Sequence, residues 1–291
     1  MSVKASSSTA PGPERARPEL EGPLPGALRI GLGRTVLELR SFFRERDAVV
    51  FIFAYPVIML AIFATVFADQ SIDMGPGGQL DFKVYFLPGM IATGLLLTSF
   101  QNLAISIAVE RDEGTLKRLR GTPMPPSAYF LGKIGSVLVT SLAQMVLLLL
   151  AARFVFGIGM PDAEGWATFA WVFVLGTASG AVCGVAFSSI PRSGKSASAV
   201  ATPVVLVLQF ISGVFFSFPS LPEWMQQLAA VFPLKWMAQG MRAAFLPDAA
   251  KVMEPAGSWE LPMVAGVLAL YLVLGLVLGV RTFRWRRRDD G

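Results

Sequence analysis

The chain has 291 residues, of which 54% are hydrophobic and only 15% are charged, whereas soluble domains carry about 25% charged residues. Together with a mean hydropathy of +0.58, this predicts an integral membrane protein made of one membrane domain, and argues against a soluble enzyme on a single anchor. The absence of histidine and the single cysteine, Cys183, exclude intrachain disulfides and disfavour a Cys/His metal or nucleophile site; the net charge of +5 comes from residues at the ends of apolar runs and does not indicate nucleic acid as a partner.

Two segments precede the first apolar run. Residues 1–27 hold mainly Ser, Pro, Gly, Glu and Arg without an apolar stretch of signal-peptide length, so we expect a disordered tail. Residues 28–47 are predicted to form an amphipathic helix in the membrane interface, because their arginines lie away from an apolar face. That face consists of Leu28, Leu32, Val36, Leu39 and Phe43.

Residues 48–283 are predicted to form a six-span transmembrane domain, which makes the chain an all-α membrane protein. The apolar runs lie at about 48–68, 84–109, 128–156, 166–190, 198–218 and 261–283. If the N-terminus is cytoplasmic, most Lys and Arg residues, including those of the basic tail at 284–291, lie in segments on the cytoplasmic side of the membrane, as the positive-inside rule requires. Lys133 and Arg153 lie near the ends of the third run and are expected to snorkel. We therefore expect a multi-pass protein of the cell (plasma) membrane, in contact with its lipids, with both termini cytoplasmic.

A dense run of charge separates the second and third apolar runs. It reads ERDEGTLKRLRGTPMPPSAYFLGK and occupies residues 110–133. Glu113 and Lys117 have the i,i+4 spacing of a short helix, and three prolines end that helix before the third run. An ordinary cytoplasmic loop would also be rich in positive charge. The alternative is a docking helix for a soluble partner.

Two motifs carry a family resemblance. The first consists of Glu110, Arg111, Gly114, Thr115, Leu116, Leu119, Thr122 and Pro123. The second is LPEWMQQLAAVFPLKWMAQGMR at 221–242. Both resemble motifs in the membrane subunits of type-2 ATP-binding-cassette exporters. The first family motif is E-R-x-x-G-T-L-x-x-L with a following Thr-Pro step, and the second is L-P-x-W-L-x-x-L-A-x-x-x-P-L-x-Y-x-x-x-x-x-R. Trp236 occupies the tyrosine position of the second motif. The resemblance covers about residues 28–283.

The resemblance implies that the charged run forms a cytoplasmic coupling helix that rests on a separate P-loop ATPase subunit. Two copies of that subunit would bind ATP and Mg²⁺, and this chain would carry no cofactor. A homodimer, or a pair with a different permease, is implied as well. Glu110 and Arg111 are also expected to hold the loop against the helix at 28–47. The coupling residues implied are Glu110, Arg111, Gly114, Thr115, Leu116, Leu119 and Pro123, with Leu116 and Leu119 as contacts to the ATPase.

A nucleotide site on this chain is not expected. RSGKS at 192–196 supplies Gly194, Lys195 and Ser196, but the first glycine of G-x-x-x-x-G-K-[ST] is replaced by Ser189. The segment also falls in a short loop between two spans. Its positive charges are better explained as topological anchors.

The segment at 221–242 is expected on the extracellular side. Prolines divide it into two short helices around Phe232 and Pro233, and the resemblance implies that these are re-entrant. They could form an outer gate or only a cap over the spans. The candidate gate residues are Leu221, Pro222, Trp224, Pro233, Trp236 and Arg242.

Polar stripes in the second and fifth runs must face the protein interior, because polar groups in hydrocarbon need hydrogen-bond partners. The family resemblance implies that these two spans line the substrate path at the dimer interface, so the stripes are candidates for substrate contact. Hydrogen bonding between helices is the alternative reading. A wall of this kind, rich in Phe, would suit a bulky amphipathic compound. The residues are Ser99, Asn102 and Ser106 in the second run, and Gln209, Ser212 and Phe216 in the fifth. Gly176, Gly180 and Gly184 in the fourth run are predicted to allow close helix packing.

The function predicted is the non-catalytic permease subunit of an exporter that moves a hydrophobic or amphipathic compound, drug-like or lipid, out of the cell. A proton-coupled secondary transporter would need a carboxylate inside the membrane, and none falls in a predicted span core. A membrane-embedded enzyme is disfavoured because the acidic residues of the outer loops show no catalytic spacing. A receptor or scaffold is compatible with the same loops.

Overall fold

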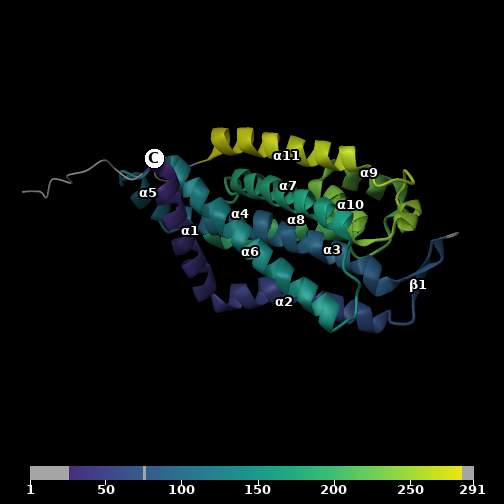
Figure 1. The fold of residues 1–291 in the computed structure, drawn as a ribbon. Helices are drawn as coiled ribbons and strands as arrows, with labels where there is room; N and C mark the ends of the chain where they lie inside the picture. Colours follow the sequence, from purple (N-terminus) through teal and green to yellow (C-terminus); the bar gives the residue numbers. More distant parts are fainter. Residues whose placement is uncertain (1–25, 75–76, 284–291) are drawn as a thin grey trace, which may run out of the picture.

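The computed structural model describes residues 26–74 and 77–283, which form a helical bundle with one short hairpin (Figure 1). All but the last two residues of the predicted tail at 1–27, and the whole basic tail at 284–291, lie outside the described residues. Six helices of the described part are long and apolar enough to cross a membrane, as predicted. They are α2 (Arg46–Val66), the continuous helix Phe82–Asp112, α6 (Pro126–Phe154), α7 (Ala163–Phe187), α8 (Gly194–Ile211) and α11 (Leu261–Thr282). The chain is a mostly helical, multi-pass membrane protein.

Shorter elements occupy the connections between the spans. These are α5 (Thr115–Arg120), α9 (Glu223–Val231), α10 (Pro233–Phe245), η3 (Phe218–Ser220) and η4 (Asp248–Met253). An antiparallel hairpin of β1 (Ser71–Asp73) and β2 (Gln79–Asp81) follows α2, with Ile72 opposite Leu80. The sequence reading did not predict this hairpin, because three-residue strands are too short to show an alternating pattern.

The N-terminal helix α1 (Ala27–Arg44) leaves its predicted apolar face exposed except for the half-buried Leu39, and packs through another face against α6. The contact is close because both helices carry glycines at the interface, and a methyl group added at Gly31, Gly132 or Gly135 would collide with the facing helix. The contacting pairs are Gly31 with Leu131, Arg34 with Gly132, and Thr35 with Gly135. The helix is therefore fastened to the third span along its length, in addition to presenting an apolar face.

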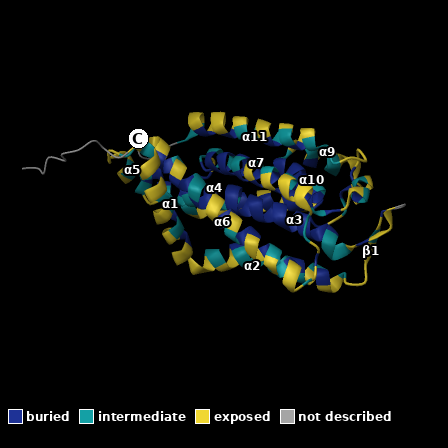
Figure 2. Ribbon diagram, in the orientation of Figure 1, coloured by how far each residue is buried: buried dark blue, intermediate teal, exposed yellow. Residues whose placement is uncertain are grey.

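The second span is the buried centre of the bundle. It consists of α3 (Phe82–Leu96), a π-helical turn η2 (Leu97–Gln101) and α4 (Asn102–Asp112). Figure 2 shows α3 almost wholly in the colour of buried residues, and each α3 residue from Tyr85 onward is buried. Because neighbouring helices enclose it, this span is less apolar than the lipid-facing α2 and α11.

The fourth span crosses the second at the π-helical turn. A side chain at Gly180 of α7 would collide with the Ser99 hydroxyl, and a Cβ at Gly184 would lie 2.7 Å from the Phe100 carbonyl oxygen. On its other side, a Cβ at Gly275 of α11 would lie 2.5 Å from Val182. The predicted packing role of the α7 glycines is thereby confirmed for Gly180 and Gly184. Only hydrogen as a side chain permits these distances.

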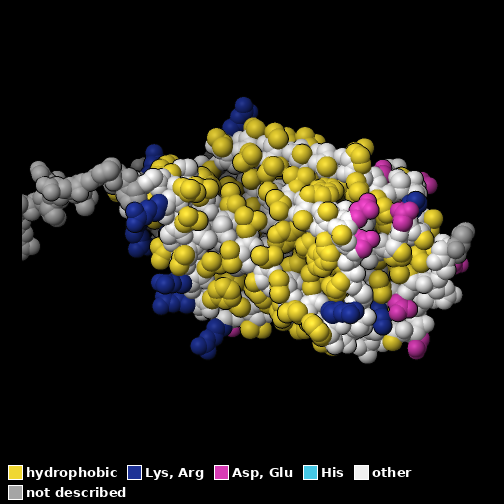
Figure 3. Space-filling view, in the orientation of Figure 1, with side chains coloured by type: hydrophobic (Ala, Val, Ile, Leu, Met, Phe, Trp, Pro, Cys, Tyr) yellow, Lys and Arg dark blue, Asp and Glu magenta, His cyan; other side chains and the backbone are white. Residues whose placement is uncertain are grey.

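The charged side chains divide between the two ends of the bundle. Figure 3 shows Lys and Arg concentrated at the end where Figure 1 places α1 and α5, and most Asp and Glu at the end with the hairpin. Between the ends, the face that Figure 3 shows is covered largely by hydrophobic side chains. This distribution matches a protein whose two ends face water and whose flanks face lipid.

Candidate functional site

The last turn of α4 joins three other parts of the chain through three consecutive residues. The Glu110 carboxylate pairs with α6, the Arg111 guanidinium donates to the Pro191 carbonyl oxygen at 3.0 Å, and the Asp112 carboxylate accepts from the Gly194 backbone N–H at 3.1 Å. Arg111 is buried, so its hydrogen bond is shielded from water and correspondingly strong. The ERD sequence therefore holds the end of the central span against the third span, the α7–α8 loop and the N-terminus of α8.

Glu110 belongs to a buried charge network that links three helices. Lys133 of α6 forms ion pairs with Glu110 and with Glu38 of α1, the latter at 2.7 Å, and Arg34 lies 2.6 Å from the other Glu38 oxygen. The Tyr129 hydroxyl donates to Glu110 Oε2 at 2.9 Å. Two cations and two carboxylates balance, which is what makes their burial tolerable. We name Arg34, Glu38, Glu110 and Lys133 the Lys133 network.

The network corrects one expectation and refines another. Lys133 does not snorkel, because its side chain is only 4% exposed and both its partners come from other helices. Glu110 does hold the loop to α1, through Lys133 and Glu38, whereas the hydrogen bond given above directs Arg111 toward Pro191. Sequence reading missed Glu38 because it lies on the α1 face opposite the apolar stripe, where a charged residue is ordinary.

Residues 193–196 (SGKS) form the N-terminus of α8. Ser193 is the N-cap of α8, and its hydroxyl and that of Ser196 complete a reciprocal capping box. The Asp112 carboxylate contacts the Gly194 N–H at this same N-terminus, where the helix dipole favours negative charge. The position that a phosphate would take at a helix start is thus already held by a side chain of this chain.

The short helix α5 follows a glycine turn. Gly114 has φ of 75°, in the left-handed region that glycine adopts without strain, and this turn redirects the chain from α4 into α5. Leu116 is fully buried, in a cluster with Leu103, Ile107 and Tyr129. The predicted short helix between the prolines and the second span is present, and its buried face is anchored in the bundle.

The burial of Leu116 corrects its predicted role as a contact to the ATPase. Leu116 has 0% of its surface exposed, so its side chain cannot contact a partner protein in this structure. Leu119 is half-buried against the same cluster. Thr115 is half-buried as well, and Pro123 is exposed after the helix. The exposed face of α5 is basic, and consists of Lys117, Arg118 and Arg120.

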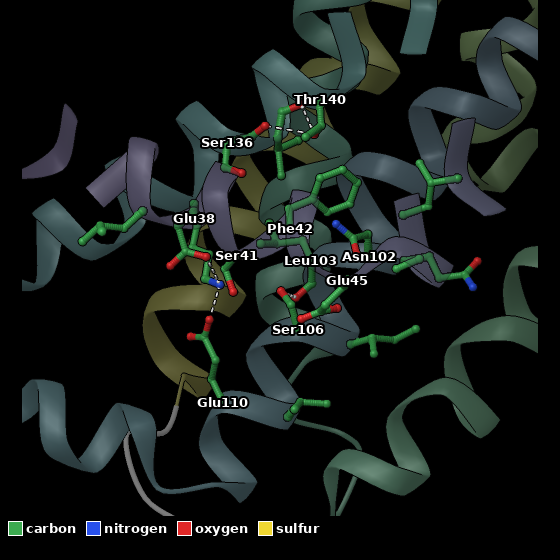
Figure 4. A pocket seen from close by; sticks show the side chains of 18 of the residues that line it. Glu38, Ser41, Phe42, Glu45, Asn102, Leu103, Ser106, Glu110, Ser136 and Thr140 are labelled. Carbon is green, nitrogen blue, oxygen red and sulfur yellow. Dashed lines mark hydrogen bonds and ion pairs between the residues drawn. The ribbon is translucent and has the colours of Figure 1, made fainter. Parts of the chain in front are cut away.

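A cavity of about 520 Å³ lies between the bend that joins α1 to α2, the second span and α6; we call it the elbow pocket. The Lys133 network forms part of its wall, and Figure 4 shows Glu38 and Glu110 beside it. Asn102 and Ser106, from the predicted stripe of the second span, also line it. The pocket therefore brings part of the predicted substrate path next to the anchored end of α4.

Ser99 is separated from the other two residues of its predicted stripe. It precedes Asn102 by three residues, the spacing of one α-helical face, but the π-helical turn alters the register between them. Ser99 is buried against Gly180 of α7, where its hydroxyl donates to the Leu95 carbonyl oxygen at 2.5 Å. Ser99 therefore serves packing between helices in this structure.

The predicted stripe of the fifth span is shorter than expected. Because α8 ends at Ile211, Phe216 lies beyond it and is 51% exposed, while Gln209 and Ser212 are buried. Gln209 accepts a hydrogen bond of 2.9 Å from the Tyr55 hydroxyl of α2. The prediction that Phe216 shares a helical face with Gln209 is therefore wrong. The apolar run extended past the helix because the loop after it is also apolar.

The segment at 221–242 does form two helices that break at Phe232 and Pro233. Arg242 is buried, pairs with Glu254 at 2.5 Å and donates to the Gly213 carbonyl oxygen at 3.3 Å. Trp236 is buried and donates from its indole nitrogen to the Ala230 carbonyl oxygen at 2.7 Å. Of the other predicted gate residues, Pro233 is buried, Leu221 is half-buried, and Pro222 and Trp224 are exposed.

A second buried lysine lies on α10. Lys235 is 4% exposed, donates to Gln239, and has its ammonium 3.6 Å from the centre of the Trp236 ring. Burial lowers the pKa of Lys235 to about 8, although Glu254 and Glu260 act to raise it. Together with the Arg242–Glu254 pair, Lys235 makes α10 a polar helix held inside the bundle. Hydrogen bonds from Gln239 to the Trp259 carbonyl oxygen and from Arg242 to the Gly213 carbonyl oxygen join α10 to neighbouring loops.

Comparison with known proteins places the chain in a family. The model of the ABC-2 type transporter family matches residues 35–246, a span that includes α4, α5 and α10. The chain is 24% identical over 221 residues to the inner membrane transport permease YadH of Escherichia coli strain K12, covering 75% of this chain and 81% of that protein. It is 24% identical over 186 residues to the probable multidrug ABC transporter permease YbhR of the same strain, covering 64% of this chain and 50% of that protein. The chain belongs to the ABC-2 type transporter family and is the membrane-embedded permease component of an ABC transporter.

Proposed function

We propose that this permease exports a hydrophobic or amphipathic compound with energy from ATP hydrolysed by a separate P-loop ATPase, two copies of which bind a pair of permease chains. The end of the bundle with α1 and α5 faces the cytoplasm, because Lys and Arg gather there (Figure 3). Both termini then lie inside the cell, the apolar face of α1 lies in the inner interface, and α9 with α10 covers the outer side as a re-entrant pair.

The anchored end of α4 carries the coupling proposal. Glu110, Arg111 and Asp112 bind three different parts of the chain, and α5 follows two residues later with Leu116 locked into the bundle. A force applied to α5 would therefore reach α1, α6 and α8 together, since each connection is a buried or partly buried polar contact. A loop that only carried topogenic charge would not need these attachments.

The contact with the ATPase is proposed to run through the exposed basic face of α5, where Lys117 and Arg120 lie beside Arg118. Substrate class is inferred from two sources. The name of YbhR describes a probable multidrug permease, and the elbow pocket combines apolar and polar walls. Both support a drug-like amphipathic compound.

The test is co-purification from native membranes with ATP hydrolysis as a second readout. The wild-type chain should recover a P-loop ATPase in equal amount, and Lys117→Glu with Arg120→Glu should reduce that recovery at least tenfold while leaving membrane insertion intact. Lys83→Glu with Lys251→Glu makes the same charge change at the other end of the bundle and serves as the control. Equal recovery with both double variants would refute docking on α5, and absence of an ATPase from the wild-type preparation would refute the proposed function.

A further inference from the structure

The elbow pocket has the size and lining of a site for one small organic molecule. Its volume of about 520 Å³ falls within the range of roughly 300–1,000 Å³ that is usual for ligand sites. Aromatic and aliphatic side chains from α1, α2 and α4 form one part of the wall, and amide and hydroxyl groups form another. The apolar part includes Phe42, Phe51, Ile52 and Leu103, and the polar part Asn102, Ser106 and Ser136.

The charge of the lining is negative. Four carboxylates line the pocket against two cations, and both cations, Arg34 and Lys133, are already paired with Glu38 and Glu110. The remaining two carboxylates belong to Glu45 and Glu113, which are exposed and form no ion pair with any residue that the structure describes. The pocket therefore carries two negative charges that its own lining does not neutralise.

The neutral groups of the pocket also favour a positive charge. The buried Gln101 Oε1 has no hydrogen-bond donor among the described residues, so it remains free to accept. Phe42 and Phe51 present aromatic rings, whose faces attract cations. Figure 4 shows Glu45, Ser106 and Asn102 around the same hollow. Acceptors, unpaired carboxylates and aromatic rings thus surround one apolar space.

We propose that the elbow pocket binds a lipophilic organic cation, with the apolar body against α2 and α4 and the positive charge held between Glu45 and Glu113. The inference names the substrate class of the proposed exporter and in that respect rests on the proposed function. Its binding step, however, concerns this chain alone. It needs neither the ATPase nor ATP.

The test compares two ions of the same shape and opposite charge, tetraphenylphosphonium and tetraphenylborate, binding to the full-length purified chain in a neutral maltoside detergent. Radiolabelled tetraphenylphosphonium should bind at least about tenfold more tightly than tetraphenylborate, since each uncompensated carboxylate within several ångströms favours the cation. In the Ser106→Trp variant the indole ring fills the pocket, so the binding of each ion that remains measures its partition into detergent. Subtracting that background leaves binding at the pocket.

Two variants test the carboxylates. Glu45→Gln with Glu113→Gln should weaken tetraphenylphosphonium binding about tenfold and leave tetraphenylborate binding equal or stronger. Glu164→Gln with Glu223→Gln removes the same charge from exposed positions outside the pocket and should change neither affinity. Exposed substitutions of this kind leave folding nearly unchanged, which size-exclusion profiles will verify.

Each result has a definite meaning. Equal affinity for the two ions, or loss of affinity in the control pair as large as in the Glu45 and Glu113 pair, would overturn the proposal. Selective binding of the cation that depends on Glu45 and Glu113 would support it even if no ATPase were recovered with the chain. Conversely, a recovered ATPase with no charge selectivity would leave the proposed function intact and remove this inference.

Discussion

The Tyr129 hydroxyl donates to Glu110 Oε2 at 2.9 Å, so a tyrosine in the first turn of the third span fixes the carboxylate at the end of the second. Lys133, one turn further along α6, pairs with the other oxygen of the same carboxylate. The two donors hold Glu110 in one orientation. A carboxylate held in this way ties the end of α4 to α6 without relying on the loop between them.

Balance of charge within the Lys133 network predicts an unusual order of stabilities. Lys133→Met leaves a net negative charge in a buried site and should lower the free energy of unfolding by about 3–5 kcal/mol. Adding Glu110→Gln restores neutrality, with Arg34 still paired to Glu38, and should recover part of that loss. Thermal unfolding of the detergent-purified variants measures both. A double variant that is less stable than Lys133→Met alone would contradict the charge-balance explanation.

Close helix contact predicts opposite effects for two glycine substitutions. Gly184→Ala puts a methyl group 2.7 Å from the Phe100 carbonyl oxygen, and because backbone must move to relieve it, we expect a loss of about 1–3 kcal/mol in unfolding free energy. Gly33→Ala in α1 meets nothing within 4 Å and should gain up to about 1 kcal/mol from helix propensity. Melting temperatures that fall equally in the two variants would argue against the close crossing of α7 and the second span.

The six membrane-crossing helices and the short helix α5 were accessible to sequence reading for a physical reason. Apolar runs of bilayer length mark spans whatever their neighbours, and the Gly114 turn requires a residue that tolerates φ of 75°. The six spans and the short helix between the second and third were therefore predictable. So was the break at Phe232 and Pro233, since proline cannot continue the preceding helix.

The errors concern side chains whose surroundings come from distant parts of the chain. The family resemblance implied that Leu116 contacts the ATPase, and only the packed cluster with Leu103 and Tyr129 shows that it is buried. Ser99 was misplaced because a π-helical turn leaves no clear mark in the sequence. The pairing of Lys133 with Glu38 joins residues 95 positions apart, so no local sequence pattern could predict it.

The proposed orientation predicts where a cysteine reagent can reach. The hairpin residue Asp73 lies at the end of the bundle opposite α5 (Figure 1). In a Cys183→Ala background, Asp73→Cys should react with a membrane-impermeant maleimide in intact cells. Arg120→Cys, on the exposed face of α5, should react only after permeabilisation. The reverse pattern would place both termini outside the cell.

The buried ammonium of Lys235 predicts a pH dependence of stability. The pKa of Lys235 in the folded chain is about 8, below the value of about 10.4 for a free lysine. Burial and the nearby positive charge of Arg242 both lower this pKa, and together they outweigh the attraction of Glu254 and Glu260, which raises it. Between these two pH values the unfolded chain binds a proton that the folded chain has released, so stability relative to Lys235→Met should rise as the pH increases from about 8 to 10. Thermal unfolding at pH 7, 8, 9 and 10 measures this difference, and Lys251→Met, which removes an exposed lysine, should show no such rise. A difference that stays flat or falls with pH would show that Lys235 remains charged in the folded protein throughout.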